Sequence, residues 1–319
     1  QCGACLHACQ YASPHEFAVN VPQAMARVRG RTYAHYAWPA GFGRAYERNG
    51  LVLAAALALG LALFLVLAVA LRGGGAALVS APGERGFYEI FPHGLMVGLF
   101  GPVFAFAVLA LALGVAQFWR DVSPGAASAP AVGEAVRDAL RLKYLDGGHG
   151  EGCNNADDAW TLSRRRAHHL TFYGFMLCFA ATCVATVWHY AFGWIAPYSW
   201  ASAPKLLGMS GGVMLATGTA WLGALHVRRH AQQRLDEQRA MDLGFIALLF
   251  ATAATGLALA LAGGSAIVPL LLCTHLGAVM ALFATMPYGK FAHGVYRVAA
   301  LLKWAIERRR PDGLRLGSE

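Results

Sequence analysis

Long, almost unbroken runs of hydrophobic residues dominate the chain and predict helices that cross a membrane. An α-helix needs about 20 apolar residues to cross the roughly 30 Å hydrocarbon core of a bilayer. Six runs come close to that length: residues 51–71, 95–119, 168–192, 205–227, 243–261 and 266–286. The sixth is expected to continue as a helix past Pro287 to His293. The pattern predicts an all-α membrane protein with a six-transmembrane helix bundle.

Composition and charge agree with this class and place the two ends of the chain. Only 13% of the 319 residues are charged, against about 25% in soluble proteins. The net charge of +9 comes from residues that flank the apolar runs, so no nucleic-acid partner is expected. Lys and Arg gather before the first run, between runs two and three and runs four and five, and after the sixth. Excess basic charge marks the cytoplasmic side. The prediction is a multi-pass protein of the bacterial inner (cytoplasmic) membrane, with both termini cytoplasmic.

Four histidines stand near the ends of the third and sixth hydrophobic segments. His275 and His293 are 18 residues apart, which is five whole turns, so they share one face of a continuous helix. His168 and His189 lie only about 60° apart around theirs. If the two helices pack antiparallel, His168 faces His293 and His189 faces His275. Imidazole is a strong iron ligand. The spacing therefore predicts axial ligands for one or two b-type haems.

Three alternatives remain open at these positions. His169 can replace His168 as the ligand, although it lies about 160° from His189 around the helix. Each buried histidine can instead be neutral and hydrogen-bonded to a neighbouring helix. His93, before the second span, is a candidate quinone contact or a structural histidine at the membrane interface.

Three cysteines near the start of the chain have the spacing C-x2-C-x3-C. Cys2, Cys5 and Cys9 match the last three cysteines of the C-x2-C-x2-C-x3-C run that binds [4Fe–4S] clusters. The first ligand would precede Cys2, so the cluster is expected to be incomplete in this chain. A zinc site is the main competing prediction.

These features divide the chain into four parts. Residues 1–20 are predicted to be the C-terminal remnant of a ferredoxin-like region, a truncated N-terminal segment. Residues 21–48 form a basic linker, and residues 49–293 form the transmembrane haem b domain. Residues 294–319 form an amphipathic, basic cytoplasmic tail. The small residues Gly211 and Gly212 predict a close helix contact in the fourth span.

Two long stretches, QCGACLHACQYASPHEFAVNVP and RRRAHHLTFYGFMLCFAATCVA, resemble the tricarballylate-utilisation or citrate-utilisation protein B family. The resemblance implies [4Fe–4S] clusters in the intact protein, a haem-containing membrane domain and an FAD-dependent dehydrogenase as partner. It implies electron transfer from that flavoprotein to membrane quinone. The membrane part is distantly similar to the gamma subunit of nitrate reductase, in which two haem ligands are also 18 residues apart. Phe179 stands where that similarity expects a further histidine.

The function predicted from these observations is an electron-transfer component of an oxidoreductase system in the lipid bilayer, without assigned catalytic residues. One alternative is a transport or structural membrane protein that carries no redox cofactor. Another is the same redox module serving the oxidation of a cobalamin precursor.

Overall fold

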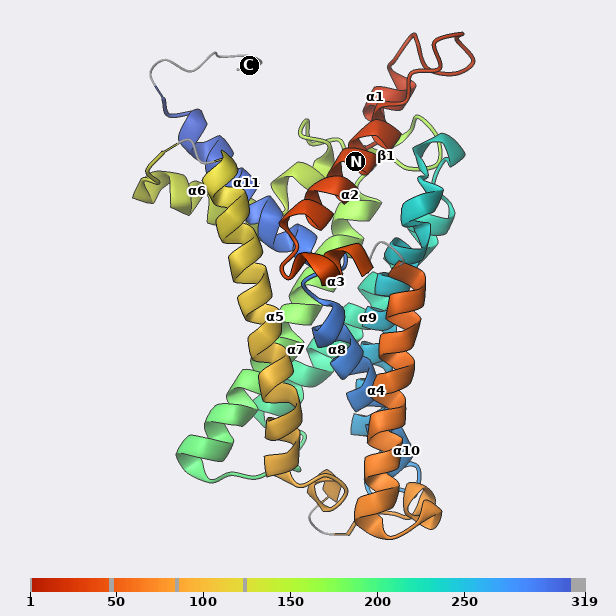
Figure 1. The fold of residues 1–319 in the computed structure, drawn as a ribbon, viewed down its shortest axis with the longest axis vertical. Helices are drawn as coiled ribbons and strands as arrows, with labels where there is room; N and C mark the ends of the chain where they lie inside the picture. Colours follow the sequence, from red (N-terminus) through yellow and green to blue (C-terminus); the bar gives the residue numbers. More distant parts are fainter. Residues whose placement is uncertain (1, 46–48, 84–85, 123–124, 311–319) are drawn as a thin grey trace.

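The computed structural model describes residues 2–45, 49–83, 86–122 and 125–310. Within those ranges, six helices are long and apolar enough to cross a membrane, and they run alongside one another as a bundle (Figure 1). They are α4 (Asn49–Arg72), α5 (His93–Val122), α7 (Ser163–Phe192), α8 (Ala203–Val227), α9 (Asp236–Ala262) and α10 (Val268–Thr285). The predicted six-span, all-α architecture is confirmed. The structure describes only a short pair of strands besides, β1 (Cys153–Asn154) and β2 (Trp160–Thr161), which pair antiparallel.

The bundle has two ends that differ in what covers them (Figure 1). One, here called the near end, carries α1 (Ala4–His7), α2 (Val21–Tyr36), α6 (Ala129–Leu140) and α11 (Ala292–Glu307). The opposite, far end carries the 3₁₀ turns η2 (Gly75–Val79) and η3 (Gly86–Glu89). Two further turns, η4 (Lys143–Asp146) and η5 (Ala231–Gln233), belong to near-end connections. Most of the polar sequence therefore lies at one end.

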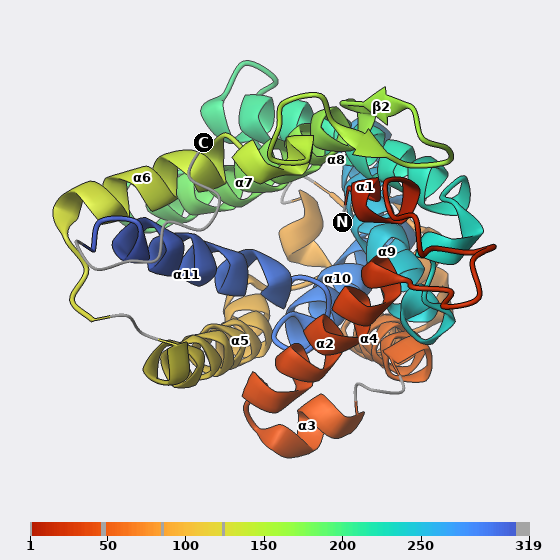
Figure 2. The ribbon, with the colours of Figure 1, turned by 90° about the horizontal axis from the view of Figure 1, so that it is seen from above.

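Small residues bring α7 and α8 together over a long contact, the most extensive between any two helices described. A Cβ added to Gly174 would stand 2.5 Å from the backbone nitrogen of Leu215, so the two backbones nearly touch there. Gly211 and Gly212 are both buried, as the sequence predicts. Helix α10 packs instead on α4 and α9, so α7 and α10 belong to different halves of the bundle (Figure 2).

The described part of the predicted basic linker is largely helical. Asn20 caps α2 by accepting a hydrogen bond from the backbone of Gln23, and Pro22 occupies the first turn, where its missing N–H is not needed. Pro39 separates α2 from the short helix α3 (Ala40–Ala45). Residues 46–48 of the predicted linker lie outside the described part. Helices α2 and α3 were not predicted from the sequence.

The sixth span does not continue to His293, and that prediction was wrong. Helix α10 ends at Thr285, and the carbonyl of Thr285 accepts hydrogen bonds from the backbone of Tyr288 and Gly289 in a turn. Pro287 in that turn cannot donate a helical hydrogen bond. His275 and His293 therefore lie on two different helices, α10 and α11.

The tail forms the amphipathic helix that its sequence predicts. Ala305 and Ile306 on α11 pack against Ala131 of α6. Beside them, Arg309 Nη1 lies 2.6 Å from a carboxylate oxygen of Glu134, and Arg308 bonds to the other oxygen. Residues 311–319 of the predicted tail lie outside the described part. An apolar face and an ion-pair cluster thus hold α11 on α6 at the near end.

Candidate functional site

Two of the predicted ligands meet at the near end of the bundle. His168 lies one turn into α7 and His293 is the second residue of α11, and their ring centres are 6.0 Å apart at an interplanar angle of 67°. Both residues are partly buried. The break after α10 does not prevent this pairing, because the start of α11 brings His293 to α7.

The two imidazoles have the properties of a bis-histidine metal site. The Nδ1 atom of His293 bonds to the carbonyl of Lys290, which fixes the tautomer and leaves Nε2 available as a ligand. Nδ1 of His168 is buried without a hydrogen-bond partner. Two imidazoles that share one metal, with metal–nitrogen bonds of about 2.0–2.1 Å, have ring centres roughly 6 Å apart. The observed separation fits such a shared metal.

His169 points to a different partner. Its ring lies parallel to that of Tyr173, with centres 6.0 Å apart, and its Nδ1 is 3.0 Å from the carbonyl of Arg165. Of the two adjacent histidines, the structure brings only His168 into ring contact with His293.

At the far end, His189 lies against His93 rather than against His275. The rings of His189 and His93, the first residue of α5, stack with centres 3.9 Å apart and an interplanar angle of 13°. Tyr88 and Tyr190 stand within 5.6 Å of the His93 ring. Stacking at 3.9 Å leaves no room for a metal between these two imidazoles. Nδ1 of His189 is buried without a hydrogen-bond partner.

His275 is held by the neighbouring helix α9. Its Nδ1 is 3.1 Å from the hydroxyl of Thr255, and a Cβ on Gly256 would stand 2.9 Å from its ring. Gly256 therefore makes the space in which the imidazole lies. In this structure the predicted partners His189 and His275 contact His93 and Thr255, respectively.

The cysteine segment is attached to the near end by backbone contacts. The backbone N–H of Asn154 in β1 donates to the carbonyl of Cys2 at 2.7 Å. Gln233 donates to the carbonyl of Asn154 at 3.1 Å and lies 3.4 Å from the ring of His7. Gly3 adopts φ +86°, and a Cβ there would stand 2.5 Å from the Asn154 carbonyl. Only glycine allows so close a contact.

The three cysteines lie near one another but do not form a single-ion site. Cys5 is exposed, and its pKa is raised by partial burial and by the nearby Cys2 thiol. Cys153, in β1, is buried, and burial raises the pKa of its thiol, with a smaller effect from Cys2. Among the described residues, no three His, Cys, Asp or Glu side chains are placed to share one metal ion. The arrangement therefore gives no support to the zinc alternative.

A short polar connection joins the cysteine segment to the histidine pair. Asn155, next to the residue that binds the Cys2 carbonyl, accepts a hydrogen bond of 2.5 Å from Arg164. Arg164 lies one helical turn before His168 on α7. Sequence reasoning did not single out Asn154, Asn155 or Gln233. The only signal was two polar pairs, NN in an acidic, glycine-rich loop and QQ in a basic loop.

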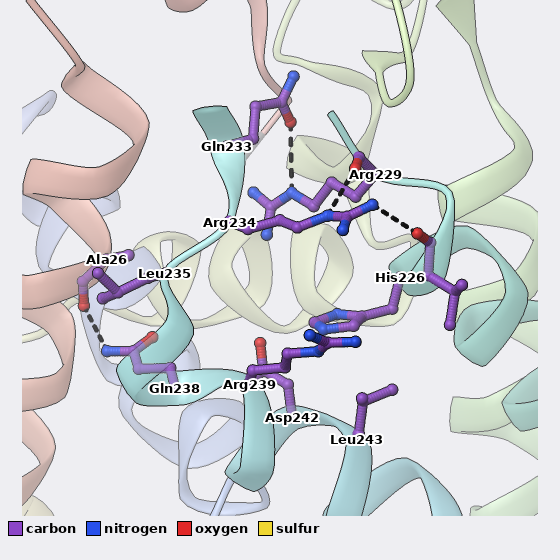
Figure 3. Close-up of a pocket in the computed structure, with 11 residues that line it drawn as sticks. Ala26, His226, Arg229, Gln233, Arg234, Leu235, Gln238, Arg239, Asp242 and Leu243 are labelled. Atoms are coloured by element: carbon purple, nitrogen blue, oxygen red, sulfur yellow. Dashed lines mark hydrogen bonds between the residues drawn. The ribbon is translucent and has the colours of Figure 1, made fainter. Parts of the chain in front are cut away.

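A small polar cavity lies nearby, between α2 and the turn that joins α8 to α9 (Figure 3). Its volume is about 20 Å³, room for about one water molecule. Arg234 donates to the carbonyls of Val227 and Arg229, and Gln238 donates to the carbonyl of Ala26. Burial, with a smaller contribution from the charge of Arg164, lowers the pKa of Arg229 to about 10. These contacts fasten the near-end loops and offer no room for a cofactor.

Comparison with known proteins agrees with the resemblance. Residues 44–313 match the family model described as citrate utilization protein B, and residues 1–35 match its Fer4-like domain. A protein of Escherichia coli named citrate utilization protein B is 55% identical over 309 residues, which is 97% of this chain and 81% of that protein. No solved structure matches. The chain therefore belongs to the citrate utilization protein B family, with a Fer4-like N-terminal segment and a membrane domain of six apolar helices.

Proposed function

We propose that the protein is a membrane electron-transfer component for citrate or tricarballylate utilization. It would accept electrons from a reduced FAD-dependent dehydrogenase and deliver them to membrane quinone. The Fer4-like segment and the family's role in citrate utilization support this proposal. The basic near end would face the cytoplasm, where a soluble flavoprotein could reach it.

One observation carries the proposal: hydrogen bonds link the attached cysteine segment to the helix that carries one histidine of the facing pair. Cys2 binds Asn154, the adjacent Asn155 binds Arg164, and His168 follows one turn later. Backbone hydrogen bonds and a buried side chain thus connect the two regions that would hold redox centres. A transport protein has no need to combine a cysteine motif with a buried histidine pair in this way.

The near-end pair is the candidate site for a haem b. His168 and His293 would hold it, because their rings face one another at 6.0 Å and the Lys290 carbonyl orients one of them. A haem there would supply one-electron chemistry between ferric and ferrous iron. The surrounding helices cover both imidazoles in part and limit their contact with water. Cys2, Cys5 and Cys9 would be ligands of a [4Fe–4S] cluster.

The far end carries the remaining elements of the proposal. A second haem on His189 and His275 stays a prediction. The stacked His93 and His189 rings with Tyr88 nearby are a candidate quinone contact, since imidazole and phenol groups can hydrogen-bond quinone oxygens.

The proposal is tested by quinone-dependent reoxidation of the reduced protein. The full chain, in lipid nanodiscs, is reduced anaerobically and mixed with a short-chain benzoquinone or naphthoquinone while haem absorbance is followed. We expect rapid reoxidation in the native protein and loss of most of the reoxidisable haem in His293→Ala. His169→Ala is the matched control, because it removes an adjacent imidazole that does not face His293.

Two results would contradict the proposal. A folded protein without haem after expression with haem supplied would exclude the redox role and favour a transport or structural function. Haem that is present but unreactive with both quinones would remove quinone as the electron acceptor.

A further inference from the structure

Each histidine of the near-end pair has an arginine one helical turn away on the near-end side. Arg164 precedes His168 by four residues on α7, and Arg297 follows His293 by four residues on α11. Residues four apart lie on the same helix face, about 6 Å apart along the axis. Because α7 begins at the near end and α11 runs outward towards it (Figure 1), Arg164 and Arg297 each stand one helical turn closer to that end than the histidine beside them.

These two charges are close enough to the pair to act on it. The charges of Arg297 and Arg164 both reach His168, and that of Arg297 also reaches His293. Lys290 is the other cation beside His293, but it is paired with Asp242 at 2.6 Å. This part of the fold therefore has an excess of positive charge suited to an anion.

Both guanidinium groups have hydrogen-bonding capacity to spare. An arginine side chain has five N–H donors. Arg164 uses Nη2 for Asn155, while its buried Nε has no partner. No hydrogen bond or ion pair of the Arg297 side chain occurs within the described ranges. Arg297 instead borders an open cleft of about 410 Å³ that Tyr144, Leu301 and Trp304 also line.

We propose that Arg164 and Arg297 form a two-part carboxylate site that holds the two propionates of a haem bound by His168 and His293, one propionate on each guanidinium. This inference rests on the proposed haem at that pair. A haem is apolar except for its two propionate carboxylates, and guanidinium is the side-chain group best matched to a carboxylate. Their placement on separate helices on the near-end side of the pair would fix the orientation of the haem plane.

The test measures the haem midpoint potential of the full chain by redox titration. Loss of a guanidinium leaves the propionate charge unneutralised, which favours ferric iron and lowers the potential. We expect Arg164→Gln and Arg297→Gln each to lower it, and the double variant to lower it further. Arg166→Gln is the matched control, because Arg166 carries the same charge in the same turn but lies about 160° from His168 around the helix. It should leave the potential unchanged.

A second readout separates a propionate contact from a general effect of charge. The resonance Raman propionate-bending band should shift in each glutamine variant and be largely restored in Arg297→Lys, which keeps a hydrogen-bond donor. If Arg164→Gln does not fold, the potential and the bending band of the exposed Arg297 variants alone test the inference. A potential and bending band unchanged by loss of Arg297 would overturn the inference, and so would an equal shift in the Arg166 control.

These outcomes are distinct from failure of the proposed function. If the native protein holds no haem, the histidine proposal itself fails. If haem is present with two histidine ligands but the arginine variants behave like the control, only the propionate site is refuted. Dependence of the Arg297 effect on anionic lipid in the nanodisc would assign that guanidinium to a lipid phosphate, and would also contradict the inference.

Discussion

Replacement of Gly174 by alanine should weaken the packing of α7 on α8, on which the position of His168 depends. The new Cβ would stand 2.5 Å from the Leu215 backbone nitrogen and 2.9 Å from the Gly211 carbonyl oxygen, where ordinary van der Waals separation begins at 3.4 Å. These neighbours are helix backbone and cannot rotate away. The helices must therefore separate locally by about 0.9 Å to restore an ordinary separation.

The cost of that separation follows from the weakened van der Waals attraction between the two helices. A gap of 0.5–1 Å forfeits about a quarter to a half of the 0.1–0.2 kcal/mol that each atom pair supplies, and a patch the size of one buried leucine has about 40–60 such pairs. The weakening amounts to about 3 kcal/mol. Alanine regains about 1 kcal/mol because it favours helix over glycine. We expect a net destabilisation of about 2 kcal/mol, within the usual range for overpacking.

The assay is equilibrium unfolding in mixed detergent micelles, followed by tryptophan fluorescence. Gly208→Ala is the matched control on the same helix pair, because its Cβ would meet only the Ala181 Cβ at an ordinary 3.7 Å. It should change the free energy of unfolding by less than about 1 kcal/mol, in the stabilising direction. A Gly174→Ala protein as stable as this control would refute the close-packing argument.

Two further predictions concern the near end. Gly3→Ala should speed hydrogen exchange of the Asn154 amide, because the new Cβ would collide with the Asn154 carbonyl at a backbone φ of +86°. Gly41→Ala is the control, because a Cβ at Gly41 has open space and should leave the exchange rate unchanged. An unchanged exchange rate in Gly3→Ala would show that the cysteine segment is not attached there. Burial alone would raise the pKa of Glu134, but hydrogen bonds and charge from two arginines of the tail hold it below its ordinary value of 4.5. The stability from this carboxylate is therefore present above pH 4.5 and lost as the pH falls further. Glu134→Gln should lower the free energy of unfolding by roughly 1–3 kcal/mol near pH 7, and by less in acid. Thermal unfolding checks this, and a difference in stability between variant and native protein that does not change with pH would contradict it.

The spans could be predicted from the sequence because a bilayer imposes a length and a composition on each. The ends were less accurate: α7 begins at Ser163 and α9 at Asp236, five and seven residues before the predicted starts. Polar residues in the first turns of these helices are outside the hydrocarbon, so hydropathy does not detect them. The break at Pro287 followed from the missing N–H of proline, which a periodicity argument does not include.

The near-end pairing was predicted from spacing along a continuous sixth helix, which the break after Thr285 removes. His168 and His293 nevertheless meet, because the start of α11 brings His293 to α7. The far end could not be predicted in the same way. Contact between His93 and His189 depends on how α5 packs beside α7, and contact between His275 and Thr255 depends on the side of α10 that α9 covers. Tertiary packing of this kind leaves no local sequence signal.

Haem quantification with visible spectra tests the central claim most directly. The detergent-purified full chain, produced with haem supplied, is measured oxidised and dithionite-reduced, together with variants of the near-end histidines. We predict a b-type reduced spectrum, with one haem per chain lost in His168→Ala and in His293→Ala and none lost in His169→Ala. A native protein without haem, or a His293→Ala protein with its full haem content, would contradict the assignment of this histidine pair.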